Sequence, residues 1–157
     1  CKTGHTFIKQ KIRETDALLG GEMSGHIFFN DRWPGFDDGI YAGARMLEII
    51  ANSEQNDPFV TVPNMLSTPE INIPAADEEK FQIVKTFIEN SNFNEAKIVG
   101  IDGIRVEFEK GWGLLRPSNT SPCLVLRFEA ETNNDLNKIK EIFYIGLKSI
   151  KPNINKF

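Results

Sequence analysis

The hydrophobic positions in the first 52 residues predict a helix, two short strands and a second helix. Residues 6–15 carry apolar side chains at helical spacing with basic residues between them, which is typical of a short amphipathic helix. Residues 18–29 have apolar ends around a glycine-rich centre, and this pattern indicates a strand, a tight loop and a strand. The second helix reaches about residue 52, and its apolar stripe is formed by Ile40, Ala44, Leu47 and Ile50 or Ala51.

Asp37 and Asp38 stand just before this second helix. Negative charge at a helix N-terminus interacts favourably with the helix dipole and with the unpaired N–H groups of the first turn. We therefore expect the two aspartates to cap the helix, and we assign them no chemical role.

The later residues predict a sheet with two helices. The elements are a strand at 70–74, a helix at 77–91, a strand pair at 97–101 and 104–108 around Asp102-Gly103, two strands at 111–116 and 123–131, and a helix at 132–150. Asp102-Gly103 is a signal for a two-residue hairpin turn. Strand, helix, several antiparallel strands and helix in this order predict an α+β fold, with the helices packed on one face of the sheet.

Each of the two later helices has a predicted cap and an apolar face. Asp77 is the predicted cap of the first, and Thr132 with Asp135 resembles a capping box for the second. The face of the first consists of Phe81, Val84 and Phe87 or Ile88. The face of the second consists of Leu136, Ile139, Phe143, Leu147 and Ile150.

Composition and charge narrow the class of protein. The chain has 157 residues, of which 40% are hydrophobic and 25% charged, which is ordinary for a globular protein of one domain or two small ones. The formal charge of −4 provides no overall attraction to nucleic acid or to an anionic membrane, and no apolar run is long enough to span a bilayer. Cys1 and Cys123 have no metal-ligand spacing, so we expect free thiols in a reducing compartment. Because the sequence opens at Cys1 without an initiator methionine, we expect a piece of a longer protein.

The loop between the last two predicted strands has the composition of an oxyanion site. Arg116 offers a planar fork of donors, the side chains of residues 118–121 add four more polar groups, and Pro117 and Pro122 stiffen both ends of the loop. We interpret this loop as a phosphate-binding site. Two other readings stay open, namely a polar surface turn and, in a secreted protein, a glycosylation acceptor at Asn119-Thr120-Ser121.

The glycine-rich stretch near the N-terminus offers a second set of polar groups. Glu22, Ser24 and His26 alternate with period two, so an extended chain would point them to one side, where they suit the hydroxyls of a sugar. His5 follows a glycine that permits close approach of a ligand, and it is a candidate acid/base or ligand contact. A glycine-rich hairpin with incidental polar residues, and an ordinary surface histidine, are the alternatives.

Three motifs occur together in an order and separation that resemble the α-D-phosphohexomutases. They are Lys2-Thr3-Gly4-His5, the stretch from Gly21 to His26, and Arg116-Pro117-Ser118-Asn119-Thr120. The chain is similar to the C-terminal third of a bacterial phosphomannomutase/phosphoglucomutase, and Glu-Met-Ser-Gly-His resembles the mannose/glucose branch. The resemblance implies that residues 1–57 are the end of a third α/β domain, residues 58–67 a hinge linker, and residues 68–157 a fourth domain with a fold like the TATA-box-binding protein.

The resemblance also implies an activity. The family's enzymes are isomerases of carbohydrate metabolism that interconvert a hexose 1-phosphate and a hexose 6-phosphate by intramolecular phosphotransfer. A phosphoserine served by Mg²⁺ donates its phosphoryl group, and a hexose 1,6-bisphosphate forms as the intermediate. This chain has neither the Ser-His-Asn context of the phosphoserine nor the Asp-x-Asp-x-Asp stretch of the metal site. We therefore expect the chain alone to be inactive and to depend on N-terminal domains that supply both.

Site residues and partners follow from the same resemblance. His5 is the implied acid/base, and the implied substrate-binding residues are Thr3, Gly4, Glu22, Ser24, His26, Arg116, Ser118, Asn119 and Thr120. The implied partners are mannose or glucose phosphates in the cytoplasm, with no metal ligand in this chain, no nucleic acid and no membrane. Two alternatives remain, namely a non-catalytic phosphate-recognising module that binds, for example, nucleic acid, and a purely structural role for residues 1–52.

Overall fold

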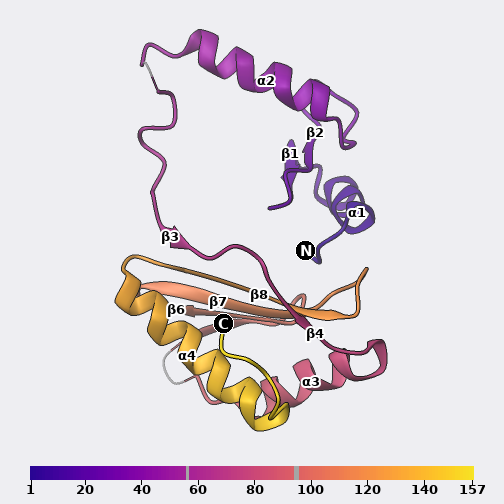
Figure 1. The fold of residues 1–157 in the computed structure, drawn as a ribbon. Coiled ribbons are helices and arrows are strands. Elements are labelled where there is room, and N and C mark those ends of the chain that lie inside the picture. The colour runs from indigo at the N-terminus through magenta and orange to yellow at the C-terminus, as the bar shows by residue number, and fades with distance from the viewer. Residues whose placement is uncertain (56, 94–95) are drawn as a thin grey trace. The chain divides into compact units, whose positions relative to one another are not determined.

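The computed structural model describes residues 1–55, 57–93 and 96–157 (Figure 1), so that Asn56, in the polar stretch between the predicted elements, lies outside the described residues. The chain forms two compact units, Cys1–Pro63 and Asn64–Phe157. The helices and strands of the first unit are α1 (His5–Thr15), β1 (Leu19–Gly21), β2 (Ile27–Phe29) and α2 (Gly39–Asn52). Those of the second are β3 (Leu66–Ser67), β4 (Ile71–Pro74), α3 (Asp77–Asn90), β5 (Lys97–Val99), β6 (Ile104–Phe108), β7 (Gly111–Pro117), β8 (Cys123–Ala130) and α4 (Asn133–Ile150).

The core of the first unit is small and lies between α1 and the hairpin of β1 and β2. The two strands pair antiparallel, as predicted, and Ile8, Ile12 and Phe28 are the buried apolar residues of this unit among those described. Gly20 is required here, because a Cβ at its position would lie 2.9 Å from Ile8 and 3.0 Å from Ile12. The helix can therefore rest directly on the strand backbone.

Helix α2 forms where it was predicted, but its apolar stripe is exposed. None of its residues is buried among the described part of the chain, and Ile40 and Leu47 are 90% and 67% exposed. Asp38 caps the helix, since its side chain accepts from the N–H of Tyr41. The prediction that Asp37 also caps it was wrong, because its side chain turns instead toward two histidines.

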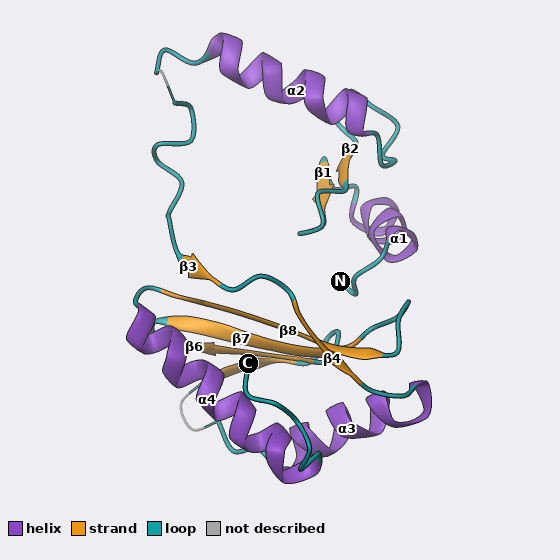
Figure 2. Ribbon diagram, in the orientation of Figure 1, coloured by secondary structure: helices purple, strands orange, loops and turns teal. Residues whose placement is uncertain are grey.

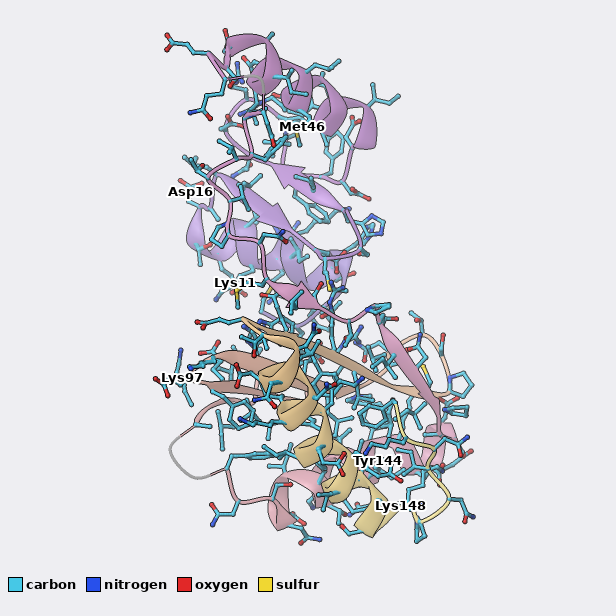
Figure 3. All side chains as sticks on the ribbon, turned by 60° about the vertical axis from the view of Figure 1, so that its left-hand side comes forward. Lys11, Asp16, Met46, Lys97, Tyr144 and Lys148 are labelled. Atoms are coloured by element: carbon cyan, nitrogen blue, oxygen red, sulfur yellow. The ribbon has the colours of Figure 1, made fainter. Side chains whose placement is uncertain are left out.

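The second unit is a six-stranded antiparallel sheet with the strand order β3-β8-β7-β6-β5, in which β4 also pairs with β8. Helices α3 and α4 lie on one face of this sheet (Figure 2), which confirms the predicted α+β architecture. Strand β7 alternates buried and half-buried residues, so Gly113 and Leu115 face the helices while Arg116 faces away from them. On the outer surface of α4, the Lys148 ammonium lies 6.0 Å from the Tyr144 ring (Figure 3).

Aromatic rings fill the space between the helices and the sheet. Phe143 of α4 packs against Phe87 of α3 and Phe128 of β8, with ring centroids 5.3 and 5.2 Å away. The predicted inward face of α4 is confirmed, as is its cap, where Thr132 accepts from the N–H of Asp135. On α3, Val84 and Phe87 are buried, but Phe81 is 56% exposed and the buried side chains include a lysine, Lys80.

Two further local predictions in this unit were wrong. Strand β5 ends at Val99, which pairs with Arg105, so the hairpin loop is longer than the predicted two-residue turn at Asp102-Gly103. Gly103 has φ +74° and packs so tightly on β7 that a Cβ there would lie 2.2 Å from the Leu115 carbonyl oxygen, which makes it part of the sheet packing as well as of the turn. In addition, Asp77 is the first residue of α3 rather than its cap, and its carboxylate pairs with Lys80.

None of the helices in the described ranges is both long enough and apolar enough to cross a bilayer.

Gly113 provides a test of the core packing. A Cβ at this position would lie 2.5 Å from the Phe143 ring, which the neighbouring rings hold in place. Gly113→Ala should destabilise the second unit by about 1–3 kcal/mol through overpacking. The measurement is urea unfolding followed by the amide signals of β7 and β8. Gly100→Ala is the control, because the only atom near its Cβ is 3.9 Å away and its effect should stay within about 0.5 kcal/mol.

The turn before α2 gives a prediction about ionisation. The hydrogen bond from Arg45 lowers the pKa of Asp31 to about 2, so the ion pair holds α2 above about pH 4 and weakens as the pH falls toward 2. Arg45→Gln should return the Asp31 pKa toward 3.8, its ordinary value, as followed by the NMR shift of its carboxyl carbon. Arg13→Gln on α1 removes the same charge and should leave that pKa unchanged, and equal shifts in both variants would contradict the assignment.

Candidate functional site

Four polar side chains of the first unit meet beside the β1–β2 hairpin. His26 Nδ1 lies 2.8 Å from Asp37 Oδ2, while His5 Nε2 lies 3.8 Å from the same oxygen and 3.9 Å from Glu22 Oε2. The two imidazole rings meet edge to face with centroids 4.4 Å apart. The side chains of His5 and His26 are 44% and 42% exposed, so each ring keeps an edge open to a ligand.

Backbone contacts hold this cluster in place. Glu22 is only 6% exposed, and its Oε1 accepts from the N–H of Gly4 at 2.7 Å. Gly4 has φ +132°, a conformation that favours glycine and that turns its N–H toward the hairpin at the start of α1. The ring of Phe28 lies 5.6 Å from that of His5 and forms an apolar wall. Two of the predicted site residues, Gly4 and Glu22, thus support each other.

The hairpin brings together some of the predicted residues and separates others. The N–H of Glu22 donates to the carbonyl of His26, and the N–H of Gly25 donates to the carbonyl of Glu22, so this stretch is a turn and not an extended strand. The prediction that Glu22, Ser24 and His26 share one face by alternation was therefore wrong. Glu22 and His26 instead face each other across the base of the turn, and Ser24 is exposed at its tip, as is Thr3 before α1.

Asp37 is a residue of this cluster that the sequence pattern does not reveal. It lies 11 residues from His26 and 32 from His5, and nothing in the local pattern separates it from a second capping residue. An isolated bridge between Phe28 and Asp37 places its backbone beside β2, and this contact turns the carboxylate toward both rings.

The donor set of this cluster does not fit magnesium. One ligand atom each from His5, Glu22 and His26 lie within 4.8 Å of one another. Mg²⁺ prefers an octahedron of oxygen ligands, whereas two imidazoles suit transition metals. We therefore derive no step through magnesium from these residues.

A second group of polar residues surrounds the loop between β7 and β8. Ser118 is buried, and its Oγ accepts from the N–H groups of Thr120 and Ser121 at 3.3 and 3.1 Å. Its hydroxyl oxygen therefore shapes the loop, while its hydroxyl proton remains a donor. The side chains of Asn119 and Thr120 are exposed at the tip.

Lys80 of α3 holds this loop in place through a hydrogen bond to its backbone. Its Nζ donates to the carbonyl of Ser121 at 3.1 Å and to Asp77 at 2.6 Å, and its side chain is only 5% exposed. A buried ammonium with two acceptors fixes the loop, and its charge is balanced by the Asp77 carboxylate. Lys80 lies between apolar positions of a helix, so the sequence pattern does not reveal its contact with the loop.

Arginines gather on the face of the sheet that the helices leave open. Leu114 pairs with Arg105 on one side and Arg127 on the other, and Arg116 follows on the same face of β7. Arg105 is engaged, since it lies 3.9 Å above the ring of Trp112 and pairs with a glutamate. For Arg116 and Arg127, both half-buried, the described residues provide no hydrogen bond or ion pair. Arg127 is thus a second available guanidinium that the sequence analysis did not single out.

Comparison with known proteins connects both groups of residues to one family. Residues 1–62 match a sequence model of the phosphoglucomutase/phosphomannomutase alpha/beta/alpha domain III, and residues 70–145 match the model of the C-terminal domain. These two ranges include the hairpin with its histidines and the loop with its arginines.

Individual relatives come from the same family as the two sequence models. The chain is 52% identical over 156 residues to a phosphomannomutase/phosphoglucomutase of Pseudomonas syringae, and 47% identical to a phosphoglucomutase of Neisseria meningitidis serogroup A. Each alignment covers 98% of this chain but 34% of the relative, so the chain spans about a third of their length. A crystal structure of a phosphoglucomutase/phosphomannomutase family protein from Burkholderia thailandensis is similar with a TM-score of 0.88 at 46% identity, over 99% of this chain and 33% of that one. The chain therefore belongs to the phosphoglucomutase/phosphomannomutase family and contains sequence of its domain III and its C-terminal domain.

Proposed function

We propose that this chain is the part of a hexose-phosphate mutase that binds the sugar hydroxyls and the phosphate group that is not reacting. The enzyme would interconvert hexose 1-phosphate and hexose 6-phosphate through a phosphoserine and a bisphosphorylated sugar. The main support is Arg116 at the edge of a loop of polar donors, together with Arg127, which pairs with Leu114 on the same face of the sheet; among the described residues neither guanidinium has a hydrogen bond or ion pair. The names of the relatives, phosphomannomutase/phosphoglucomutase and phosphoglucomutase, agree with this reading.

The phosphate site would act as a clamp. A guanidinium binds phosphate oxygens through two parallel hydrogen bonds, and the polar side chains of Ser118, Asn119 and Thr120 add neutral donors. The loop is already shaped by its internal hydrogen bonds and by Lys80, so little conformational entropy is lost on binding. A fixed clamp on the idle phosphate allows the sugar to bind in either of two orientations.

The histidine cluster would serve the sugar. The Glu22 carboxylate accepts from sugar hydroxyls, while the two imidazoles donate or accept according to their tautomers. His5 would be the acid/base residue near the reacting hydroxyl. Thr3, the backbone of Gly4, and Ser24 at the tip of the hairpin turn would add further substrate contacts. Nothing in this cluster can replace a phosphoserine, so phosphoryl transfer itself would depend on residues elsewhere.

Several features of the enzyme belong to this proposal as expectations. Mg²⁺ would be bound by residues outside this chain, and hexose 1,6-bisphosphate would be the intermediate and activator. Residues 58–67 would be a hinge between the end of the third domain, residues 1–57, and the fourth domain, residues 68–157. The enzyme would work in the cytoplasm, which fits the free thiols of Cys1 and Cys123.

A chimera tests the proposed activity. These 157 residues would replace the matching third of the Pseudomonas syringae relative, and turnover of glucose 1-phosphate and mannose 1-phosphate would be measured with added bisphosphate. We expect turnover by the chimera and none by this chain alone. The variant Glu22→Ala in the chimera should raise KM or lower kcat at least tenfold, because it removes a nearly buried hydrogen-bonding carboxylate. Turnover by the isolated chain, or a folded chimera that is inactive, would contradict the proposal.

The phosphate clamp can be tested on this chain directly. Inorganic phosphate and mannose 1-phosphate would be titrated while the amide signals of residues 116–123 are followed by NMR. Arg116→Gln and Arg127→Gln should each weaken binding about tenfold or more, because each removes a charge-assisted hydrogen bond. Arg105→Gln is the matched control, since that guanidinium is already engaged with Trp112 and Glu107. Equal weakening by all three would indicate a diffuse electrostatic effect, and phosphate binding together with an inactive chimera would favour a non-catalytic phosphate-recognising module.

A further inference from the structure

We propose that Asp37 is a positioning residue that sets the ring tautomer and the orientation of His26. The observation is geometric, since Asp37 Oδ2 lies 2.8 Å from His26 Nδ1 although His26 directly precedes β2 and Asp37 lies 11 residues later, before α2. The consequence for the reaction rests on the function proposed above, whereas the tautomer itself does not.

Both partners of this contact are held by the backbone. The N–H of Glu22 donates to the carbonyl of His26, which fixes the start of β2. The bridge between Phe28 and Asp37 fixes the backbone of the aspartate beside the same strand, and the next residue, Asp38, caps α2. The carboxylate and the ring therefore meet in a defined geometry, unlike two long side chains that pair at a surface.

A carboxylate acceptor decides where the imidazole proton is. An ionised carboxylate can only accept hydrogen bonds, so His26 Nδ1 has to carry the proton that it donates. The neutral ring then presents Nε2 as an unprotonated acceptor, whereas a free neutral imidazole prefers the opposite tautomer. Asp37 thereby turns the open edge of His26 into a proton acceptor.

This arrangement makes His26 a second candidate, beside His5, for proton exchange with a sugar hydroxyl. When the hydroxyl attacks the phosphorus of the proposed phosphoserine, the sugar O–P bond forms while the P–O bond to serine breaks, and the electron pair of that bond leaves with the serine oxygen. The hydroxyl O–H bond breaks in the same step, its electron pair stays on the sugar oxygen, and the proton forms a bond to His26 Nε2. The resulting imidazolium carries N–H groups on both nitrogens, and its charge lies next to the carboxylate 2.8 Å away. In the reverse direction, Nε2 returns the proton to the leaving sugar oxygen, and His26 is neutral again.

Glu22, the second carboxylate of the cluster, does not set the tautomer of His26. Glu22 is held by the N–H of Gly4 and lies 3.9 Å from His5, while Asp37 lies 3.8 Å from His5 and in hydrogen-bonding contact with His26. The two carboxylates thus have different partners. Glu22 accepts from the backbone N–H of Gly4, and Asp37 contacts the two imidazoles. This difference explains why a residue beside a helix cap points away from the helix.

The tautomer can be read directly by NMR. The chain has only two histidines, so long-range correlations between ring protons and ring nitrogens assign both rings, at about pH 8.5 where imidazole is neutral. In the wild-type chain we expect His26 to carry its proton on Nδ1. In Asp37→Asn the amide can donate to Nδ1, so the proton should move to Nε2. The matched control is Asp38→Asn, which removes the same charge from the neighbouring residue, keeps a good capping side chain and should leave the tautomer unchanged.

The wild-type spectrum alone can overturn the proposal, whether or not the variants fold. A His26 ring protonated on Nε2 in the unmodified chain would show that Asp37 does not set the tautomer. An unchanged tautomer in a folded Asp37→Asn chain would also contradict it.

Kinetics of the chimera described above separate the positioning role from the proposed function. Asp37→Asn should lower kcat about 10–100-fold with little change in KM, and Asp38→Asn should leave both unchanged. Because Asp37 acts through His26, the double variant with His26→Asn should be no slower than His26→Asn alone. Independent, multiplying effects would overturn the positioning role. If His26→Asn is itself without effect, the proposed role of His26 in the reaction fails, while the NMR result still decides whether Asp37 sets its tautomer.

Discussion

The pairing of β7 with β8 is the interaction on which the second unit depends. It aligns Leu115 with Leu126 and Gly113 with Phe128, so one face of both strands meets α4. Because side chains alternate along a strand, burying this face necessarily turns Arg116 and Arg127 to the other. The same register that closes the core therefore brings the arginines together on the open face of the sheet, where anion binding is proposed. A slip of one residue would bury the arginines and expose the core, which is why the hydrophobic pattern fixes the register so strongly.

Glycine at two points of this sheet permits an approach that no other residue allows. At Gly113 the ring of Phe143 occupies the space of a side chain, and at Gly103 the backbone of β7 does. Gly103 lies directly against Arg116, since a Cβ at Gly103 would be 2.6 Å from the arginine Cα, whereas Gly113 lies three residues before Arg116 on β7 and faces the helices. Tight packing here places the arginine at the edge of the loop, and none of the residues that the structure describes forms a hydrogen bond with its guanidinium.

The first unit positions its polar cluster with only a small apolar core. Three buried side chains, Ile8, Ile12 and Phe28, support α1 on the hairpin, and the polar cluster is held mainly by backbone hydrogen bonds. Such bonds are short-range and directional, so they fix histidine and carboxylate positions without a large core. The exposed apolar stripe of α2 shows that this unit leaves hydrophobic surface unburied among the described residues, and the relatives are about three times as long as this chain.

The sequence by itself determined the helices, most of the strands, the sheet with helices on one face and the loop around Arg116. These features depend on local periodicity, capping and turn chemistry, which a linear pattern records. It misplaced Ser24, because alternation along an extended strand does not apply inside a turn. Only the tertiary structure decided that Asp37 meets His26, that Lys80 lies under the carbonyl of Ser121 and that Arg127 joins the face of Arg116. Those contacts join residues from different elements, and no local pattern distinguishes an aspartate beside a cap, or a lysine in a buried helix face, from its ordinary surface counterpart.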